Sequence, residues 1–201
     1  MLSFKSLQVL LVSLCLLLAE GVLASASGET VLITGANRGI GLALATQFHE
    51  QGYQVIATAR NPEKATALNK LGVEVQQLDI ADKASVLALS ERLKGRTIDV
   101  LLNNAGIAGH STSNFKDLDV ERLERVLDIN SLGALRVTQA LLPNLEKSPH
   151  KVVASISSKM GSIEQNTSGG SYGYRASKTA LNSFNKSLSV EFGPQGFVFV
   201  V

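Results

Sequence analysis

The stretch Val31-Leu32-Ile33-Thr34-Gly35-Ala36-Asn37-Arg38-Gly39-Ile40-Gly41 decides the fold class of this chain. Its apolar start predicts a short buried strand, and a helix follows the glycines to about Gln51. Glycines let the backbone turn tightly and approach a pyrophosphate, which the N-terminus of the helix attracts. The spacing is G-x-x-x-G-x-G and not the commoner G-x-G-x-x-G, and a glycine-rich turn without a ligand is the alternative. The residues expected to bind a ligand here are Gly35, Asn37, Arg38, Gly39, Ile40 and Gly41.

The pattern of strand, turn and helix repeats along the rest of the chain. We expect further strands at residues 53–58, 73–78, 98–102, 151–156 and 197–201, and helices at 62–71, 83–94, 119–145 and 172–192. Short apolar strands that alternate with helices predict a parallel sheet covered on both faces. Right-handed crossovers then give a doubly wound, Rossmann-like α/β fold in a single domain.

Length, charge and histidine spacing argue against several classes of protein. The chain has 201 residues and a net charge of +2, with acids and bases mixed along its length. It is long enough for one domain with a substantial core. It lacks the concentration of basic residues that a nucleic-acid-binding surface requires. Its three histidines, His49, His110 and His150, share no spacing, so we expect no metal site and no Ser/His triad.

The first 26 residues differ from the rest of the chain. Lys5 precedes an apolar run from Leu7 to Leu18, and the small residues Ala24-Ser25-Ala26 follow. This order is typical of a secretory signal peptide, with residues 27–201 as the mature domain. An uncleaved membrane anchor and a buried N-terminal helix are the alternatives. The leader predicts a location in the secretory pathway or an organelle, and a cytoplasmic one if it is a gene-model artefact.

The end of the second strand indicates which cofactor would bind. An acid at this position would bind a ribose hydroxyl, as in NAD sites. The strand ends instead at Ala59 with Arg60 after it, and Arg38 lies in the glycine turn. Two guanidinium groups can clamp a 2′-phosphate bidentately, which favours NADP over NAD. Two solvated arginines are the alternative.

Polar residues also follow the third and fourth strands. Asp79, which precedes Ile80, could accept a hydrogen bond from an adenine amino group. Asn104 and Ala105 come at the carboxyl end of the fourth strand, where ligands bind in such sheets. Taken singly, each could be an ordinary polar turn.

A tyrosine and a lysine share one face of the helix at 172–192. Tyr174 and Lys178 are four residues apart and therefore lie one turn from each other. A cation held near a phenol favours the phenolate, so this tyrosine could exchange a proton with a carbonyl or an alcohol at neutral pH. Ser158, from another segment, could hydrogen-bond the same substrate oxygen. Because Y-x-x-x-K also occurs by chance, a solvated pair is the alternative.

The helix at 119–145 has a polar residue on its inward face. Asn130 fills the gap in a stripe of apolar residues, Leu123, Leu127, Ala134, Val137 and Leu141. A buried amide must be hydrogen-bonded. Asn130 therefore either braces the backbone or contacts a polar site, and we favour the second interpretation.

Together and in this order, the motifs resemble the classical short-chain dehydrogenase/reductase family over about residues 30–200. The segments Ser157–Ile163 and Tyr174–Lys178, with 166–170 between them, look most like its C-factor/sniffer-like carbonyl reductase branch. The resemblance also implies a homo-oligomer that packs through the helices at 119–145 and 172–192.

The resemblance implies a role for each catalytic position. Tyr174 would be the acid/base, and Ser158 would orient the substrate carbonyl. Lys178 would bind the nicotinamide ribose and tune the tyrosine, so that Tyr174 and Lys178 also contact the cofactor. Asn130 would hold a proton-relay water. Tyr172 has the wrong spacing to Lys178 and is expected to be structural.

These inferences predict an NADP-dependent oxidoreductase that transfers a hydride between nicotinamide and a carbonyl or secondary alcohol. The chain departs from the family in its leader and in stopping at Phe197–Val201, within the expected sixth strand. We therefore expect a chain truncated before the last strand and the substrate-covering segment. A non-catalytic nucleotide-binding fragment or splice variant is the first alternative. An extended-type epimerase or dehydratase is the second, although it needs a longer chain and another glycine spacing.

Overall fold

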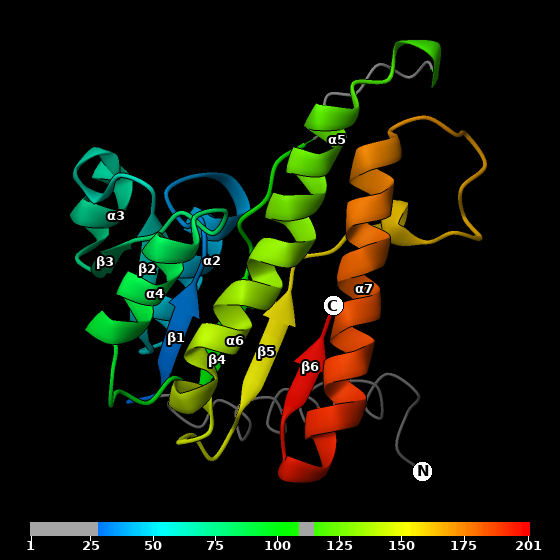
Figure 1. Cartoon of the computed structure of the whole chain (residues 1–201). Coiled ribbons are helices and arrows are strands. Elements are labelled where there is room, and N and C mark those ends of the chain that lie inside the picture. Colours follow the sequence, from blue (N-terminus) through cyan, green and yellow to red (C-terminus); the bar gives the residue numbers. More distant parts are fainter. Residues whose placement is uncertain (1–27, 109–114) are drawn as a thin grey trace, which may run out of the picture.

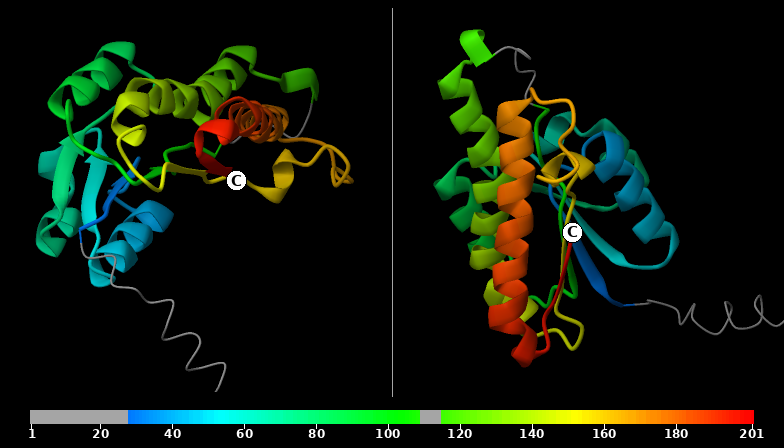
Figure 2. Two further views of the ribbon diagram at one scale, coloured as in Figure 1. Left: turned by 90° about the horizontal axis from the view of Figure 1, so that it is seen from below. Right: turned by 90° about the vertical axis from the view of Figure 1, so that its right-hand side faces the viewer.

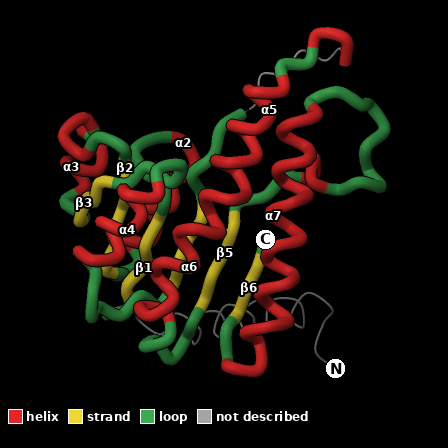
Figure 3. The backbone as a smooth tube through the Cα atoms, viewed as in Figure 1, coloured by secondary structure: helices red, strands yellow, loops and turns green. Residues whose placement is uncertain are grey.

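A computed structural model describes residues 28–108 and 115–201 (Figure 1). In these residues six parallel strands form one sheet in the order β3-β2-β1-β4-β5-β6, and Figure 3 shows them side by side. The strands are β1 (Thr30–Ile33), β2 (Gln54–Ala59), β3 (Glu74–Gln77), β4 (Val100–Asn103), β5 (Val152–Ser155) and β6 (Val198–Val200). The predicted doubly wound parallel sheet is confirmed. Strand order reverses between β1 and β4, where such sheets bind ligands.

Within the described residues, six α-helices cover the two faces of the sheet. They are α2 (Gly39–Glu50), α3 (Thr66–Leu71), α4 (Lys83–Arg92), α5 (Val120–Leu127), α6 (Ala134–Leu145) and α7 (Tyr172–Phe192). Figure 2 shows α2 on one side of the sheet and α4, α6 and α7 on the other. Side chains of β1 alternate between the two faces, as the period of a strand requires. Val31 and Ile33 pack with Leu68 of α3, whereas Leu32 packs with Leu89 and Leu141 of α4 and α6.

Two predicted helices differ from the observed ones in their interiors. The helix expected at 62–71 is a 3₁₀ turn, Pro62–Lys64, followed by α3, because Asn61 caps the turn by accepting a hydrogen bond from the Lys64 N–H. The helix expected at 119–145 runs from α5 to α6 through one π-helical turn, Asp128–Gly133. Pro143 lies in the last turn of α6, close to the helix end that it was expected to mark.

A buried carboxylate fastens the start of β4. Asp99 is 6% exposed and interrupts an otherwise apolar strand sequence. Its carboxylate accepts hydrogen bonds from the Thr30 N–H at 2.7 Å and the Ser148 hydroxyl at 2.6 Å. Each carboxylate oxygen therefore has a hydrogen-bond partner. Through these bonds Asp99 joins β1, β4 and the loop before β5, far from the carboxyl ends of the strands.

Some sequence predictions fall on residues that the structure does not describe. The leader at 1–26 and His110 lie outside the described residues. In the part of the chain that is described, no helix has the length and apolar composition needed to cross a membrane.

Gly41 lies in the first turn of α2 at a point where no side chain fits. A Cβ at this position would collide with Asn104 Nδ2 and would lie only 2.6 Å from the carbonyl oxygen of Gly35. The close approach of α2 to the turn before it therefore depends on glycine at position 41.

We expect Gly41→Ala to lower the thermal unfolding midpoint of the protein by several degrees, because overpacking against backbone costs about 1–3 kcal/mol. Gly193→Ala is the matched control, since Gly193 has a φ of −53° and an added Cβ would meet nothing within 4 Å. Scanning calorimetry of both variants measures the difference. Equal midpoints for the two variants would mean that the turn adapts without cost.

Candidate active site

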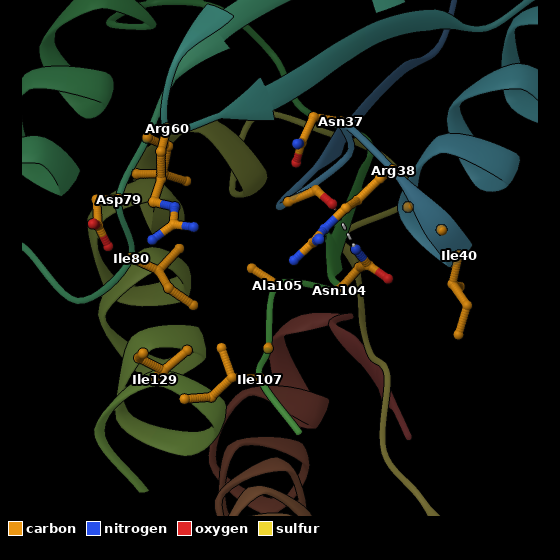
Figure 4. Close-up of a pocket in the computed structure, with 15 residues that line it drawn as sticks. Asn37, Arg38, Ile40, Arg60, Asp79, Ile80, Asn104, Ala105, Ile107 and Ile129 are labelled. Carbon is orange, nitrogen blue, oxygen red and sulfur yellow. Dashed lines mark hydrogen bonds between the residues drawn. The ribbon is translucent and has the colours of Figure 1, made fainter. Parts of the chain in front are cut away.

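A cleft of about 620 Å³ lies at the carboxyl ends of β1, β2, β3 and β4 (Figure 4). It brings together every nucleotide-binding residue predicted from the first four strands. Four lining residues, Leu78, Gly106, Ile107 and Ile129, were not predicted, since an apolar residue in a loop or helix carries no distinct sequence signal. The full lining is Gly35, Asn37, Arg38, Gly39, Ile40, Gly41, Arg60, Leu78, Asp79, Ile80, Asn104, Ala105, Gly106, Ile107 and Ile129.

The glycine turn has the backbone conformation that only glycine adopts without strain. Gly35 and Gly39 have φ values of +64° and +58°. A Cβ on Gly35 would lie 2.9 Å from the Cα of Ala105, whereas a Cβ on Gly39 would meet nothing within 4 Å. Gly35 is therefore needed for close packing as well, and Gly39 for the turn alone. Helix α2 starts at Gly39 with no side-chain cap and no acid in its first turn, which leaves its N–H groups available to an anion.

Hydrogen bonds interlock the turns after β1 and β4. The Thr34 hydroxyl oxygen accepts from the N–H groups of Asn104 and Ala105, both at 3.0 Å. In return, Asn104 Nδ2 donates to the carbonyl oxygens of Thr34 at 2.9 Å and Gly35 at 3.1 Å. Asn104 lines the cleft as predicted, but both its amide protons hold the glycine turn, so its side chain offers a ligand only an acceptor.

Two arginines reach into the cleft from different elements. Arg38 extends from the glycine turn and Arg60 from the end of β2 (Figure 4). No carboxylate is present at the end of β2, where Ala59 is buried. On the same side of the cleft as Arg60 (Figure 4), the Asp79 carboxylate accepts a hydrogen bond from the Ala81 N–H at 3.0 Å, which fixes its position. The arrangement supplies positive charge at one end and a fixed acceptor near it.

Tyr174 and Lys178 lie together on α7, as predicted. The Lys178 ammonium is 5.8 Å from the centre of the Tyr174 ring and donates a hydrogen bond to the Ile156 carbonyl oxygen at 2.6 Å. Lys178 is only 6% exposed, and this burial lowers its pKa. A lysine held by a backbone carbonyl beside a phenol is placed to act on that phenol electrostatically.

Ser158 approaches α7 through a short 3₁₀ helix, Lys159–Gly161. Its hydroxyl oxygen caps that helix by accepting from the Met160 N–H at 3.2 Å, so the hydroxyl proton is free to be donated. Gly161 lies against α7, where an added Cβ would be 3.0 Å from the Cβ of Lys178. The structure therefore sets the Ser158 segment beside the Tyr174/Lys178 turn.

Asn130 is 2% exposed and lies in the π-helical turn. Its Oδ1 accepts from the Ile107 N–H at 2.8 Å, and its Nδ2 donates to the Ile107 carbonyl at 3.0 Å and to the Ser177 hydroxyl at 3.1 Å. The Asn130 amide thus braces the backbone after β4, which was the alternative interpretation, and the catalytic role of Asn130 stays a prediction. The relay water stays a prediction.

Ser177 joins this brace to helix α7. The residue is fully buried, and its hydroxyl donates to the Tyr174 carbonyl oxygen at 2.8 Å while it accepts from Asn130. Sequence reasoning gave Ser177 no role, because a helical serine beside the lysine has no spacing that marks it. The Tyr172 ring packs against the Phe115 ring, with 5.7 Å between the ring centroids, as expected of a structural residue.

Within residues 28–108 and 115–201, no three His, Cys, Asp or Glu side chains gather as a metal ion would require. His150 pairs with Glu29 at 3.1 Å, and this pair lies next to the first residue of β1.

Comparisons with known proteins give one family. The family model described as "short chain dehydrogenase" matches residues 29–201. The C-signal protein of Myxococcus xanthus is 46% identical over 104 residues, which are 52% of this chain and 62% of that protein. For two other curated relatives, the chain spans 55% of their length.

Solved structures agree with this assignment. Carbonyl reductase Sniffer of D. melanogaster superposes with a TM-score of 0.80 and 32% identity, covering 85% of this chain and 78% of that one. A putative short-chain dehydrogenase/reductase from Burkholderia multivorans with bound NADP gives a TM-score of 0.75 and 31% identity, over 83% of this chain and 74% of that one. The predicted resemblance, including its C-factor/sniffer-like branch, is confirmed.

The lowered pKa of Lys178 predicts how the stability of the folded protein changes with pH. Between that pKa and the usual 10.5, the unfolded chain binds more protons at Lys178 than the folded chain does, so stability rises with pH in this window. Lys178→Met removes the titrating group. We expect the unsubstituted protein to gain stability relative to Lys178→Met as pH rises toward 10.5 in urea unfolding.

Lys186→Met is the control for this comparison, because Lys186 is exposed on the same helix. Its pH profile should follow that of the unsubstituted protein. A stability difference between Lys178→Met and the unsubstituted protein that stays constant with pH would contradict the prediction.

Proposed function

The chain belongs to the short-chain dehydrogenase family, a family of oxidoreductases, and on that premise we propose that it is an NADP-dependent carbonyl reductase or alcohol dehydrogenase. The proposal rests on one observation above all. A nucleotide-sized cleft with two arginines and the Tyr174/Lys178 turn are joined through the Ile107–Asn130–Ser177 hydrogen bonds. A binding cleft and a proton donor are thereby held in one frame.

The residues present fit NADP better than NAD. Gly39 and the uncapped start of α2 suit a pyrophosphate, and Arg38 and Arg60 suit a 2′-phosphate. An acid that would select the free ribose hydroxyl is not found at the end of β2. The bound NADP of the Burkholderia neighbour supports the same choice. When bound, the cofactor supplies the hydride and the protein supplies orientation and the proton.

We assign proton transfer to the Tyr174 hydroxyl. During reduction it gives its proton to the substrate oxygen as that oxygen becomes negative. The Lys178 charge beside the ring stabilises the phenolate that remains, and the free Ser158 proton can be donated to the same substrate oxygen. In oxidation of an alcohol each step runs in reverse.

We expect Tyr174→Phe to lower kcat for carbonyl reduction by about 10²–10⁴-fold, the usual contribution of a positioned acid. NADPH affinity should change little, since the ring and its packing remain. Tyr172→Phe is the matched control and should keep its activity, because the Tyr172 ring contacts Phe115. Steady-state kinetics and an NADPH titration measure both quantities. Equal kcat values for Tyr174→Phe and the unsubstituted protein would exclude this mechanism.

Cofactor choice is tested at Arg60. We expect Arg60→Ala to weaken NADPH binding by about ten- to a hundredfold, the value of a lost hydrogen bond between charged groups, and to leave NADH binding nearly unchanged. Arg122→Ala, an exposed arginine of α5, controls for the change in net charge. Fluorescence titration with both nucleotides gives the dissociation constants. A parallel loss of NADPH and NADH affinity would remove Arg60 from the 2′-phosphate site.

A nucleotide-binding protein without turnover is the alternative, because the chain spans only part of the length of its relatives. NADPH titration separates the two. Binding with reduction of a panel of carbonyl compounds supports the enzyme, whereas binding without turnover supports the alternative.

We further propose that the protein is a homo-oligomer that packs through α5 and α7 and that its leader directs it to the secretory pathway. Analytical ultracentrifugation and N-terminal sequencing of protein from cells test these proposals.

A further inference from the structure

A buried amide oxygen at the end of β4 has no hydrogen-bond partner. Asn103 is 5% exposed, and its Nδ2 donates to the Thr138 hydroxyl oxygen at 3.0 Å. Thr138 donates its own proton to the Ala134 carbonyl at 2.9 Å, which fixes the orientation of the Asn103 amide. Asn103 Oδ1 therefore points elsewhere, and it accepts no hydrogen bond from any residue that the structure describes. Such an acceptor is rare in a folded protein and calls for a donor.

A small cavity of about 10 Å³ lies beside this amide, between the sheet and helices α6 and α7. This volume is close to the least that holds one water molecule. Asn103 and Ser155 are register partners in the adjacent strands β4 and β5, so their side chains leave the same face of the sheet side by side. The polar residues that line the cavity are Asn103, Ser131, Thr138, Ser155 and Asn185.

The hydroxyl groups around the cavity have already used their own protons. The Ser155 hydroxyl donates to Asn185 Oδ1 at 3.3 Å, and Asn185 Nδ2 donates to the Leu181 carbonyl at 2.9 Å. The Ser131 hydroxyl donates to the Leu127 carbonyl. The cavity therefore presents the acceptors Asn103 Oδ1 and Ser155 Oγ, and its occupant must donate to them.

A cation does not fit this site. The remaining walls are the apolar residues Ala134, Leu135, Leu181, Phe184 and Leu188, and no carboxylate lines the cavity. An ion there would be buried without a compensating charge, at a cost that acceptors on one side cannot offset. We propose that a single internal water molecule binds here and donates to Asn103 Oδ1 and Ser155 Oγ.

This water links the elements that carry the active site. Asn103 precedes Asn104, whose amide holds the glycine turn. Ser155 ends β5, three residues before Ser158. Asn185 lies two turns after Lys178 on the buried face of α7. The water thereby joins the ends of β4 and β5, and the Ser155–Asn185 hydrogen bond extends this link to the helix that carries Tyr174. This connection does not depend on the proposed reaction.

A crystal structure of the protein tests the proposal directly. We expect an ordered water within about 3.2 Å of both Asn103 Oδ1 and Ser155 Oγ. A cavity that is filled by side chains or left without density, or an Asn103 Oδ1 that accepts from a protein group, would overturn it.

A double-mutant cycle gives a second readout in solution. Asn103→Leu and Ser155→Val each remove one acceptor of the water, and each should lower the thermal midpoint by about 4 °C or more. The double variant should lose clearly less than the sum, since both changes remove the same water. Asn103→Leu combined with Ser187→Ala, at an exposed serine of α7, should be additive. Additive losses in the first pair would contradict a shared water.

Discussion

The interlock of the two turns after β1 and β4 is the interaction on which the candidate site depends. Parallel strands β1 and β4 are neighbours at the point where strand order reverses, so the chain leaves them in opposite directions and opens a crevice. Thr34 and Asn104 close the base of that crevice with four hydrogen bonds between 2.9 and 3.1 Å. Gly35 and Gly41 lie so close to this interlock that a side chain on either would break it. The floor of the cleft is therefore backbone that the Thr34 hydroxyl and the Asn104 amide hold in place.

The second constraint is the brace that runs from the loop after β4 to helix α7. Asn130 binds both polar groups of the Ile107 backbone, and Ser177 passes the connection to the Tyr174 carbonyl. The π-helical turn at Asp128–Gly133 presents Asn130 to this loop, and such turns are frequent at functional sites. The cleft and the Tyr174/Lys178 turn therefore share a single hydrogen-bonded frame.

Much of this could be predicted from sequence. Strand and helix order follow from apolar runs and glycine turns, because a parallel sheet buried on both faces needs nearly continuous apolar strands. Arg38, Arg60, Asp79 and Asn104 were placed at one edge because the carboxyl ends of parallel strands meet there. The interruptions within helices could not be predicted, because there the local structure depends on contacts with other elements of the fold. The split at Ala65 and the π-helical turn depend on tertiary contacts that periodicity does not record.

By itself, the sequence determined the succession of strands and helices, the glycine turn, the two arginines of the cleft and the Tyr174/Lys178 pair, since each rests on local spacing or on the rules of parallel sheets. Only the tertiary structure decided what Asn130, Ser177 and Asn103 do. A polar residue on a buried face must find a partner, but the identity of that partner depends on which backbone and side-chain groups the fold brings within hydrogen-bonding distance. For Asn130 these are Ile107 and Ser177, at separations of 23 and 47 residues along the chain. No pattern in a single segment specifies contacts of that range.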